Sequence, residues 1–563
     1  MEELSKAQRA RSAIAAFKTL TDALILTGSY QPSGTTGRKL EDALRQFSPE
    51  IYGSMSDQRV VELKGLEYVI DRLPRGIEEC NKIVLTAQED LEGTSFEEIR
   101  PLKRRRLSYV VSRKEICFVI TKGPTEIYDI LTHLTFMNIE AQKIRTQINR
   151  QGSEASLEWK SLQQIVDTEH LPDGPDLDQA IWNLSIILGR TYRETWETYQ
   201  YLDQNRVKGF NNGLFRIVHR LGSRILNEEQ GEDDRLTIYF TPSLQDILGH
   251  HRYASQWAVS LKKRLLAMDL QARPMHIVSA NMHSFRNIFY GYGALQGIGI
   301  TPADDLYQMI HQLREYHDDI ERYAGPFGFS LHQDVSGSNI DVQIIDTGRL
   351  VEACVHPKVL LSWDYIKKVQ PVILVMDYAF GAQAYEVMDE LLSPLVLDGR
   401  EWTLAIESIS IMGKAGILPG KKGDIMLATA HVMEGTPHNY ILENDLSKGD
   451  FHGDLDVFCG PMVTVLGTSL QNRDVLERFH SSSWRAIGIE MEGGHYQRAI
   501  NAAIIQRRIP KNMKTRYAYY ASDNPLVSGQ TLASGPMGDE GIMPTYLISK
   551  VIVEKILRTD HVP

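Results

Sequence analysis

The sequence predicts an α/β protein. We expect a C-terminal domain with a central mixed, largely parallel sheet flanked by helices, preceded by a mainly α-helical region and a small α/β segment. Short β-rich runs alternate with helical stretches from residue 231, and from residue 351 the strands are near-continuous apolar runs. Such runs are typical of strands buried on both faces, as in a parallel sheet covered by helices. Before residue 231, apolar residues recur mainly at helical spacing.

Residues 1–230 are predicted to form a mainly helical domain, to which the sequence assigns no role. A short β unit is expected near residues 108–120, where two apolar runs flank a polar turn. The polar, turn-rich stretch 151–178 is a candidate linker or surface excursion. Residues 180–202 are expected to form one long helix.

The rest of the chain divides into two predicted parts. Residues 231–350 contain β-rich runs at 236–242, 275–281 and 341–346, separated by helical stretches. This segment is either a part of its own or belongs to one of its neighbours, so the boundary near residue 350 is open by tens of residues. Residues 351–563 alternate more cleanly between strands and helices, and we expect them to form the main domain.

Composition excludes several classes of protein. With 42% hydrophobic and 24% charged residues, the chain is neither disordered nor collagen-like. A net charge of -11 argues against a nucleic-acid partner, because phosphate neutralisation needs a basic face. We see no run of 18 apolar residues and no signal-peptide core, so we expect a cytoplasmic protein with no membrane partner. The four scattered cysteines fit a reducing compartment.

Polar clusters follow four of the predicted strands. They contain Asp377, residues 413–416, residues 490–493 and residues 522–524. In parallel sheets, ligands bind at the carboxyl ends of strands, so these clusters are the candidate site. Any one of them could instead be a helix cap, but the four together, in this order, point more specifically to a functional site than any single cluster does.

The last of these clusters carry a resemblance to a family. The segments GKAGILPGKKGDIMLATAHV (413–432), IGIEMEGGHY (487–496) and YASDNPL (520–526) resemble the purine nucleoside phosphorylase and nucleosidase superfamily. The resemblance covers roughly the last 200 residues. The branch it resembles most is AMP nucleosidase, because Gly529 and Leu532 follow the Ser-Asp-x-Pro-Leu motif. The resemblance implies a homo-oligomer and a nucleoside phosphorylase-like domain without metal or cofactor.

The family's chemistry suggests roles for three residues. Cleavage of an N-glycosidic bond leaves negative charge on the base and positive charge on the sugar. By resemblance, Asp523 protonates the purine near N7, which requires a raised pKa. Glu492 accepts hydrogen bonds from the 2′- and 3′-hydroxyls and offsets the sugar's charge, and Met491 lies against the ribose. Two simpler interpretations stay open: a helix-start acid for Glu492 and a turn acid for Asp523.

Neighbouring residues are expected to bind substrate as well. Glu490 is expected to hydrogen-bond within its turn, although some relatives use a similar position near the sugar. Lys414 has two open interpretations, a phosphate ligand or a lid cation that faces water. The remaining predicted substrate contacts are Gly413, Ala415, Gly416, Ser522 and Asn524.

Two departures from the family favour water over phosphate as the nucleophile. Hexameric phosphorylases carry Gly-Asp-Pro-x-Arg after their first strand, and that arginine holds the attacking phosphate. Residues 376–381 here read MDYAFG, with no arginine, and the glycine turn at 413–416 lacks the usual serine. Asp377 is then a candidate general base for water.

A nucleotide substrate would need cations for its 5′-phosphate. Lys414, Arg473 and Arg516 are candidates in the third part. In the second part, His283 and Arg286 follow a β-rich run, so this segment either contacts the phosphate or serves in domain packing and helix capping.

The resemblance therefore implies hydrolysis of a purine nucleoside or nucleotide, preferably AMP-like, to free base and ribose or ribose phosphate. The alternatives are a phosphorylase that uses inorganic phosphate and a nucleoside-binding sensor without catalysis. In a third alternative, the helical region senses a partner and switches the enzyme.

Overall fold

The computed structural model describes residues 5–91, 93–104, 106–148, 156–168, 171–231, 235–527 and 537–558. The chain forms two compact units. The first contains Met1–His250 together with Ser469–Val475, and the second contains His251–Thr468 and Leu476–Pro563. The short segment joins the first unit through contacts such as that of Asn472, whose side-chain amide donates to the backbone carbonyl of Phe47 (2.7 Å).

The first unit contains a six-stranded mixed sheet. Its order is β1–β6–β2–β5–β4–β3, in which β2 runs parallel to both β5 and β6 and the other pairs are antiparallel. The strands are β1 (Ser29–Tyr30), β2 (Lys82–Thr86), β3 (Glu97–Ile99), β4 (Ser108–Ser112), β5 (Glu115–Val119) and β6 (Thr237–Phe240).

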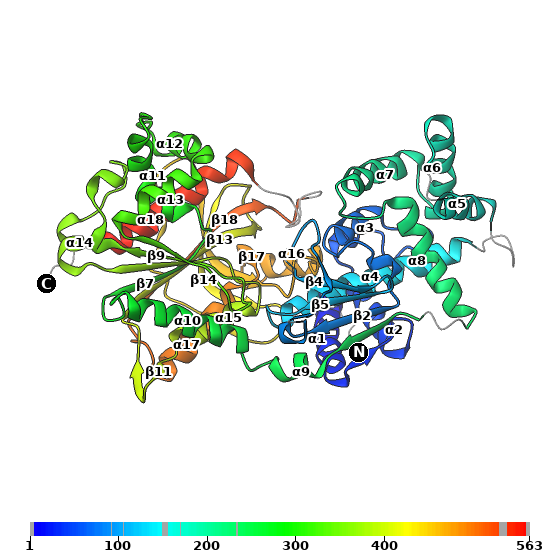
Figure 1. The fold of residues 1–563 in the computed structure, drawn as a ribbon, viewed down its shortest axis with the longest axis horizontal. Coiled ribbons are helices and arrows are strands. Elements are labelled where there is room, and N and C mark those ends of the chain that lie inside the picture. Colours follow the sequence, from blue (N-terminus) through cyan, green and yellow to red (C-terminus); the bar gives the residue numbers. More distant parts are fainter. Residues whose placement is uncertain are drawn as a thin grey trace. The chain divides into compact units, whose positions relative to one another are not determined.

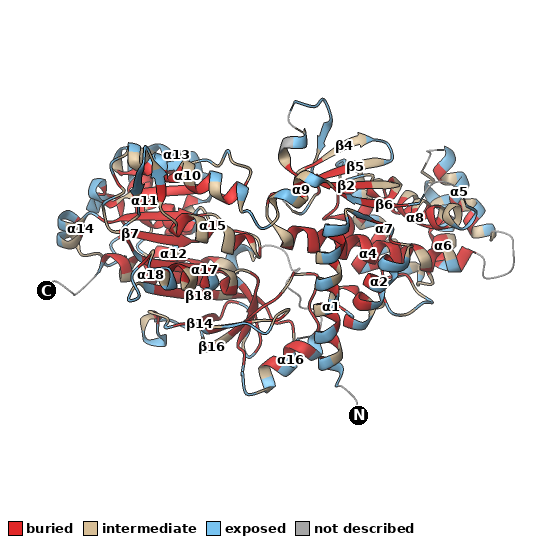
Figure 2. Ribbon diagram, turned by 90° about the horizontal axis from the view of Figure 1, so that it is seen from below, coloured by how far each residue is buried: buried red, intermediate tan, exposed pale blue. Residues whose placement is uncertain are grey.

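Nine α-helices complete the described part of this unit. They are α1 (Lys6–Thr27), α2 (Thr35–Phe47), α3 (Leu63–Ile70), α4 (Pro124–Ile148), α5 (Leu157–Thr168), α6 (Gly174–Leu188), α7 (Tyr192–Val207), α8 (Leu214–Glu229) and α9 (Pro242–Ile247). Helix α4 is buried along most of its length, as its red colour in Figure 2 shows. Within the described residues, no helix combines the length and apolarity needed to span a membrane.

The structure differs from the sequence prediction at two helices of this unit. The expected single helix over 180–202 is interrupted between α6 and α7. Gly189 ends α6 with φ 64°, and a Cβ there would lie 2.2 Å from the carbonyl oxygen of Arg59. Thr191 then starts α7 with a capping box closed by Glu194. The stretch 151–178, expected as a linker or a surface excursion, contains α5 and the start of α6 in its described part.

The β unit expected near 108–120 is present as β4 and β5, but it is part of a larger sheet. Strand β6, which the sequence places in the second part, pairs with both β1 and β2. The first unit therefore extends to His250 and not to residue 230.

The second unit is an α/β structure around a mixed ten-stranded sheet. Nine strands follow the order β15–β14–β16–β17–β13–β7–β10–β9–β8, and β18 pairs with β13 and β14. They are β7 (Met275–Ser279), β8 (Phe329–His332), β9 (Val342–Asp346), β10 (Val372–Met376), β13 (Ile406–Ile417), β14 (Ile425–Met433), β15 (Asn439–Ile441), β16 (Val457–Thr464), β17 (Gly488–Glu490) and β18 (Lys514–Asp523). A separate hairpin joins β11 (Leu395–Leu397) to β12 (Arg400–Trp402).

Five of these strands close into a ring. Strand β13 pairs with β18, β18 with β14, β14 with β16, β16 with β17, and β17 with β13 again. The end of β13 is therefore paired on both edges, to β18 and to β17. Strands β7, β10, β13 and β18 run in the same direction, so their carboxyl ends lie at one edge of the sheet.

Helices cover the two faces of this sheet with separate apolar cores (Figure 1). One core includes α10 (Arg252–Ala267), α15 (Gln383–Leu392) and α17 (Gly493–Ile505). The other includes α11 (Ser284–Gly297), α12 (Leu306–Gln312), α13 (His317–Ala324) and α18 (Ile542–Leu557). The remaining α-helices are α14 (Trp363–Val369) and α16 (Arg473–Ser481), and residues 473–475 of α16 belong to the first unit.

The expected boundary near residue 350 does not appear in the structure. Strand β7, from the predicted segment 231–350, lies between β10 and β13, which belong to the predicted domain 351–563. Strands β8 and β9 extend the same sheet beyond β10. These backbone hydrogen bonds make residues 251–350 part of the second unit.

Candidate active site

The end of β13 brings three of the predicted clusters together. Gly416 is paired with Asp523 on β18 and with Ile489 on β17. The stretch 413–416 therefore lies beside the end of β18 on one edge and beside the start of the 490–492 turn on the other. Gly416 suits this position because a Cβ there would lie 2.9 Å from Cγ1 of Ile489.

Asp523 is a buried carboxyl group with one unused oxygen. Its residue is 2% exposed, and Ser522 donates a hydrogen bond to its Oδ1 (2.5 Å). Its Oδ2 has no hydrogen-bond partner among the described residues. Burial raises the pKa of Asp523 above its usual value, although the hydrogen bond from Ser522 and the charge of Lys414 oppose that rise. The group is thus suited to hold a proton and to present it.

Glu492 is held between two segments of the second unit. Its residue precedes α17, and its Oε1 accepts a hydrogen bond from the backbone N–H of Gly381 (2.9 Å) in the loop after β10. It is only half-buried, whereas the neighbouring Met491 is buried. The carboxylate thus has a fixed position at the carboxyl edge of the sheet.

Glu490 anchors the turn that carries Glu492. Its Oε2 accepts the backbone N–H groups of Glu492 (2.7 Å) and Gly493, and its Oε1 accepts from Thr464 and contacts Nδ1 of His431 (3.2 Å). Burial alone would raise the pKa of Glu490, but these partners hold it below its usual value. The prediction that Glu490 hydrogen-bonds within its turn is confirmed. Gly493 is needed there, because a Cβ would lie 2.3 Å from Cε1 of His431.

A cavity of 480 Å³ opens beside Lys414 at the same edge of the sheet. This volume lies within the roughly 300–1,000 Å³ of small-molecule sites. The side chain of Lys414 is exposed, while Asp523 and Glu492 do not line this cavity. The lining residues are His283, Asn287, Ile310, Arg314, His317, Tyr378, Lys414, Tyr520, Met537, Gly538, Gly541, Ile542, Thr545 and Tyr546.

His283 reaches this cavity, but Arg286 does not. Nδ1 of His283 lies 3.0 Å from the hydroxyl of Tyr546. Burial, with the charges of Arg286 and His317, lowers the pKa of His283 to about 4, so the ring is neutral at neutral pH. Arg286 forms an ion pair with Glu321 and contacts Nδ1 of His317 (3.1 Å).

The other two predicted phosphate cations are not at the cavity. Arg516 is buried near the start of β18 and forms an ion pair with Asp445 (2.8 Å). Arg473 belongs to the first unit. The motif residues Gly529 and Leu532 lie outside the described residues.

Asp377 and Asn524 are also engaged. The half-buried Asp377 follows β10, and its Oδ1 accepts the backbone N–H of Tyr378 (2.8 Å). The side-chain amide of Asn524 donates to the carbonyl oxygens of Leu418 (3.1 Å) and Gly420 (2.9 Å). Asn524 therefore holds the turn after β13, which is a structural role beside the predicted binding one.

Several cavity residues carried no signal in the sequence. Arg314 and His317 lie at the turn between α12 and α13, with no motif around them. Two tyrosines could have been found from the sequence. Tyr378 lies just after the end of β10, and Tyr520 lies on β18 opposite Lys414.

One group of side chains in the described residues comes within metal-binding distance. The ligand atoms of His251, Asp389 and Glu390 lie within 4.8 Å of one another. Asp389 already forms an ion pair with Arg508 (2.6 Å), and Nδ1 of His251 lies 3.6 Å from Glu390. The carboxylates of Asp389 and Glu390 thus already have basic side chains beside them, Arg508 and His251, and do not need a metal ion to balance their charge.

Comparisons with known proteins place the chain in a family and find partial likenesses of fold. The model of the family described as "Family of unknown function (DUF6909)" matches residues 38–301 and 303–558. A comparison with curated proteins finds no match.

Solved structures resemble about half of the chain. A 5′-methylthioadenosine/S-adenosyl homocysteine nucleosidase from Campylobacter jejuni is 10% identical at a TM-score of 0.29, covering 51% of this chain and 99% of that one. Futalosine hydrolase from Helicobacter pylori is 10% identical at a TM-score of 0.27, and the match covers 50% of this chain and 97% of that one. Isoform 2 of uridine phosphorylase from Schistosoma mansoni is 12% identical at a TM-score of 0.30, and the match covers 54% of this chain and 89% of that one.

The ionisation of Asp523 gives a testable effect on stability. Because its folded-state pKa is raised, the ionised carboxylate weakens the fold. This penalty is absent below the unfolded pKa of about 3.9 and grows as the pH rises through the folded value. Asp523→Asn should therefore raise the unfolding temperature by a few degrees at pH 7, with a gain that shrinks toward pH 4, as measured by scanning calorimetry.

Asp445→Asn is the matched control, because it leaves the buried Arg516 without its charged partner. We expect this variant to unfold at a lower temperature throughout the same pH range. A stability gain for Asp523→Asn that did not depend on pH would contradict the raised pKa.

Proposed function

This chain belongs to the DUF6909 family, and we propose that it hydrolyses the N-glycosidic bond of a purine nucleotide, AMP-like in preference. The products are the free base and ribose phosphate. The observation that carries the proposal is the buried carboxyl of Asp523, with its raised pKa and its unused Oδ2, at the carboxyl edge of a parallel set of strands.

Asp523 acts as the general acid. As the bond between ribose and purine breaks, its electron pair moves onto the base, and the proton of Asp523 moves to the purine near N7. General acid catalysis of this kind contributes about 10²- to 10⁴-fold to the rate. The hydrogen bond from Ser522 fixes Oδ1, so the proton is presented on Oδ2.

Glu492 stabilises the positive charge that develops on the sugar. A carboxylate held in place before the reaction stabilises such charge without reorganisation. The hydrogen bond from Gly381 and the turn anchored by Glu490 supply that rigidity. The same carboxylate accepts the ribose hydroxyls, and Met491 contacts the sugar ring.

Water is the nucleophile in this proposal. Its oxygen forms the new bond to C1′ of the sugar, and its proton passes to Asp377, which follows β10. Two observations support water over phosphate: residues 376–381 contain no arginine, and the turn 413–416 contains no serine.

The 5′-phosphate of the substrate lies in the cavity beside Lys414. Lys414 and Arg314 supply positive charge there, and Asn287, Thr545 and Tyr546 supply hydrogen-bond donors. Arg314 also forms an ion pair with Asp539, which competes with the phosphate for this guanidinium. This charge pattern supports a nucleotide over an uncharged nucleoside.

Detection of free base by chromatography tests the reaction. Purified protein is incubated with purine nucleosides and nucleotides, with and without inorganic phosphate. We expect AMP to release adenine without phosphate and Asp523→Asn to lower the rate at least 100-fold, because the leaving group loses its proton donor. Asp398→Asn, in the exposed turn between β11 and β12, is the control and should keep full activity.

Two outcomes would contradict the proposal. Base release that required inorganic phosphate would show a phosphorylase and would replace water as the nucleophile. Absence of release from every substrate would favour a nucleotide-binding protein without catalysis.

A second prediction separates the phosphate contact from the catalytic step. Lys414→Met should lower kcat/KM for AMP about 10- to 100-fold, since a hydrogen bond to a charged group contributes roughly 1.5–3 kcal/mol. The value for adenosine, which lacks the phosphate, should change much less. Lys511→Met, at an exposed position before the start of β18, is the control. An equal loss of kcat/KM for AMP and for adenosine would show that Lys414 does not contact the phosphate.

A further inference from the structure

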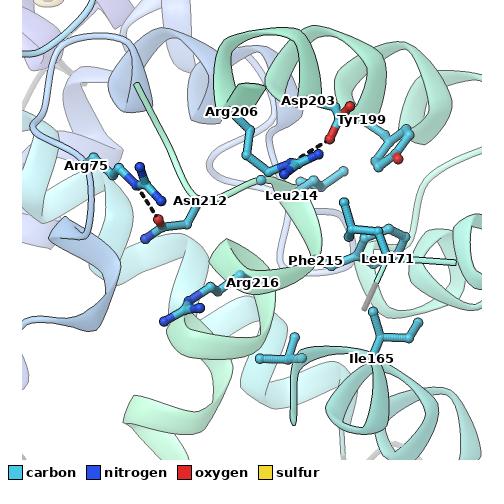
Figure 3. A pocket seen from close by; sticks show the side chains of 12 residues that line it. Arg75, Ile165, Leu171, Tyr199, Asp203, Arg206, Asn212, Leu214, Phe215 and Arg216 are labelled. Atoms are coloured by element: carbon cyan, nitrogen blue, oxygen red, sulfur yellow. Dashed lines mark hydrogen bonds and ion pairs between the residues drawn. The ribbon is translucent and has the colours of Figure 1, made fainter. Parts of the chain in front are cut away.

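The first unit contains a cavity of its own. It has a volume of 250 Å³ and lies between α5, α7 and the start of α8 (Figure 3). Its lining includes Arg75, Arg206, Asp203, Tyr199 and Phe215. All of the residues that line the cavity belong to the first unit, so the cavity is complete within it.

The cavity has a basic side and an apolar side. Figure 3 shows Arg75 and Arg216 on one side, Ile165, Leu171 and Phe215 on the other, and Arg206 joined to Asp203. Arg216 is already paired with Glu79, which leaves Arg75 and Arg206 as the candidate anion ligands. A site with this division suits a ligand that has a charged end and an apolar body.

Two arginines are positioned with their terminal nitrogens available. Nε of Arg75 donates to Oδ1 of Asn212 (2.7 Å), and Nε of Arg206 donates to Oδ1 of Asp203 (2.6 Å). Among the described residues, neither guanidinium makes a further hydrogen bond through its terminal nitrogens. A guanidinium held through Nε still presents a fork that matches a carboxylate or a phosphate.

The start of α8 accommodates Arg206. Gly213 precedes this helix with φ 84°, and a Cβ there would lie 2.8 Å from Cδ of Arg206. Glycine is thus the residue that allows the arginine to pack against the start of the helix.

The apolar side continues into a row of aromatic rings. The rings of Tyr199 and Phe215 lie 5.5 Å apart between centroids, and those of Tyr199 and Trp196 lie 5.7 Å apart. Trp196 and Tyr199 are half-buried, whereas Phe215, at the end of the row, is buried. Such faces stack against a flat ring.

We propose that this cavity is a second small-molecule site, which binds a compact anion made of one carboxylate or phosphate group on a flat ring. The acidic group contacts Arg75 and Arg206, and the ring lies against Tyr199 and Phe215. The volume falls just below the roughly 300–1,000 Å³ of ordinary ligand pockets and therefore selects small ligands. The site shares no residue with the proposed active site and gives the first unit a ligand-binding role.

Calorimetric titration of the full chain tests this proposal with phenyl phosphate and benzoate as probes. Phenol and inorganic phosphate, which each carry half of the recognised chemistry, are titrated in parallel. We expect saturable binding of at least one of the two aromatic anions, and binding at least tenfold weaker for phenol and for inorganic phosphate.

Arg75→Gln is the first variant, because Arg75 is exposed and we expect its replacement to leave the fold intact. It should weaken the binding of the aromatic anion at least tenfold, and the double variant with Arg206→Gln should abolish it. Arg193→Gln removes an exposed arginine of α7 that does not line the cavity, and it should bind as the unmodified chain does.

Three results would overturn the proposal. They are the absence of saturable binding by both aromatic anions, unchanged affinity in Arg75→Gln, and binding of phenol as tight as that of the anions. Because no nucleotide turnover is measured, these results are independent of the proposed hydrolysis.

Discussion

The double pairing of β13 is the constraint on which the candidate active site depends. Gly416 is paired with Asp523 on one edge and with Ile489 on the other, and these contacts help to close a ring of five strands. Because backbone hydrogen bonds fix both partners, the acid at the end of β18 and the carboxylate after β17 cannot move independently. The ring therefore supplies the preorganisation that charge stabilisation requires.

Two buried carboxyl groups near this ring differ because their partners differ. Glu490 accepts several hydrogen bonds and faces His431, so its pKa is lowered and it serves as a structural anion. Asp523 accepts one hydrogen bond from Ser522, and its other oxygen has no partner among the described residues, so its pKa is raised. Burial opposes charge in both, and the number of partners decides which group keeps its proton.

The sequence predicted six strands after residue 351, because most of them lie in long apolar runs, and it predicted the turn that Glu490 anchors. It did not predict the three-residue strands β11, β12 and β15, which are too short to show a pattern. It did not predict the domain boundary, since β7 pairs with strands far along the chain and no local pattern shows this. Arg516 was expected at a phosphate, but the carboxylate of Asp445 that occupies it is 71 residues away in the sequence. Arg314 and His317 reach the cavity through tertiary packing alone.

The protonation state of Asp523 is the most direct test of this account. Infrared difference spectra between the unmodified chain and Asp523→Asn, recorded across pH, isolate the C=O band of this carboxylic acid. We expect the band to persist above the ordinary aspartate value of about 3.9 and then to disappear on further alkalinisation. A band that titrates at or below that value would show an ordinary carboxylate and would contradict the role of Asp523 as the proton donor.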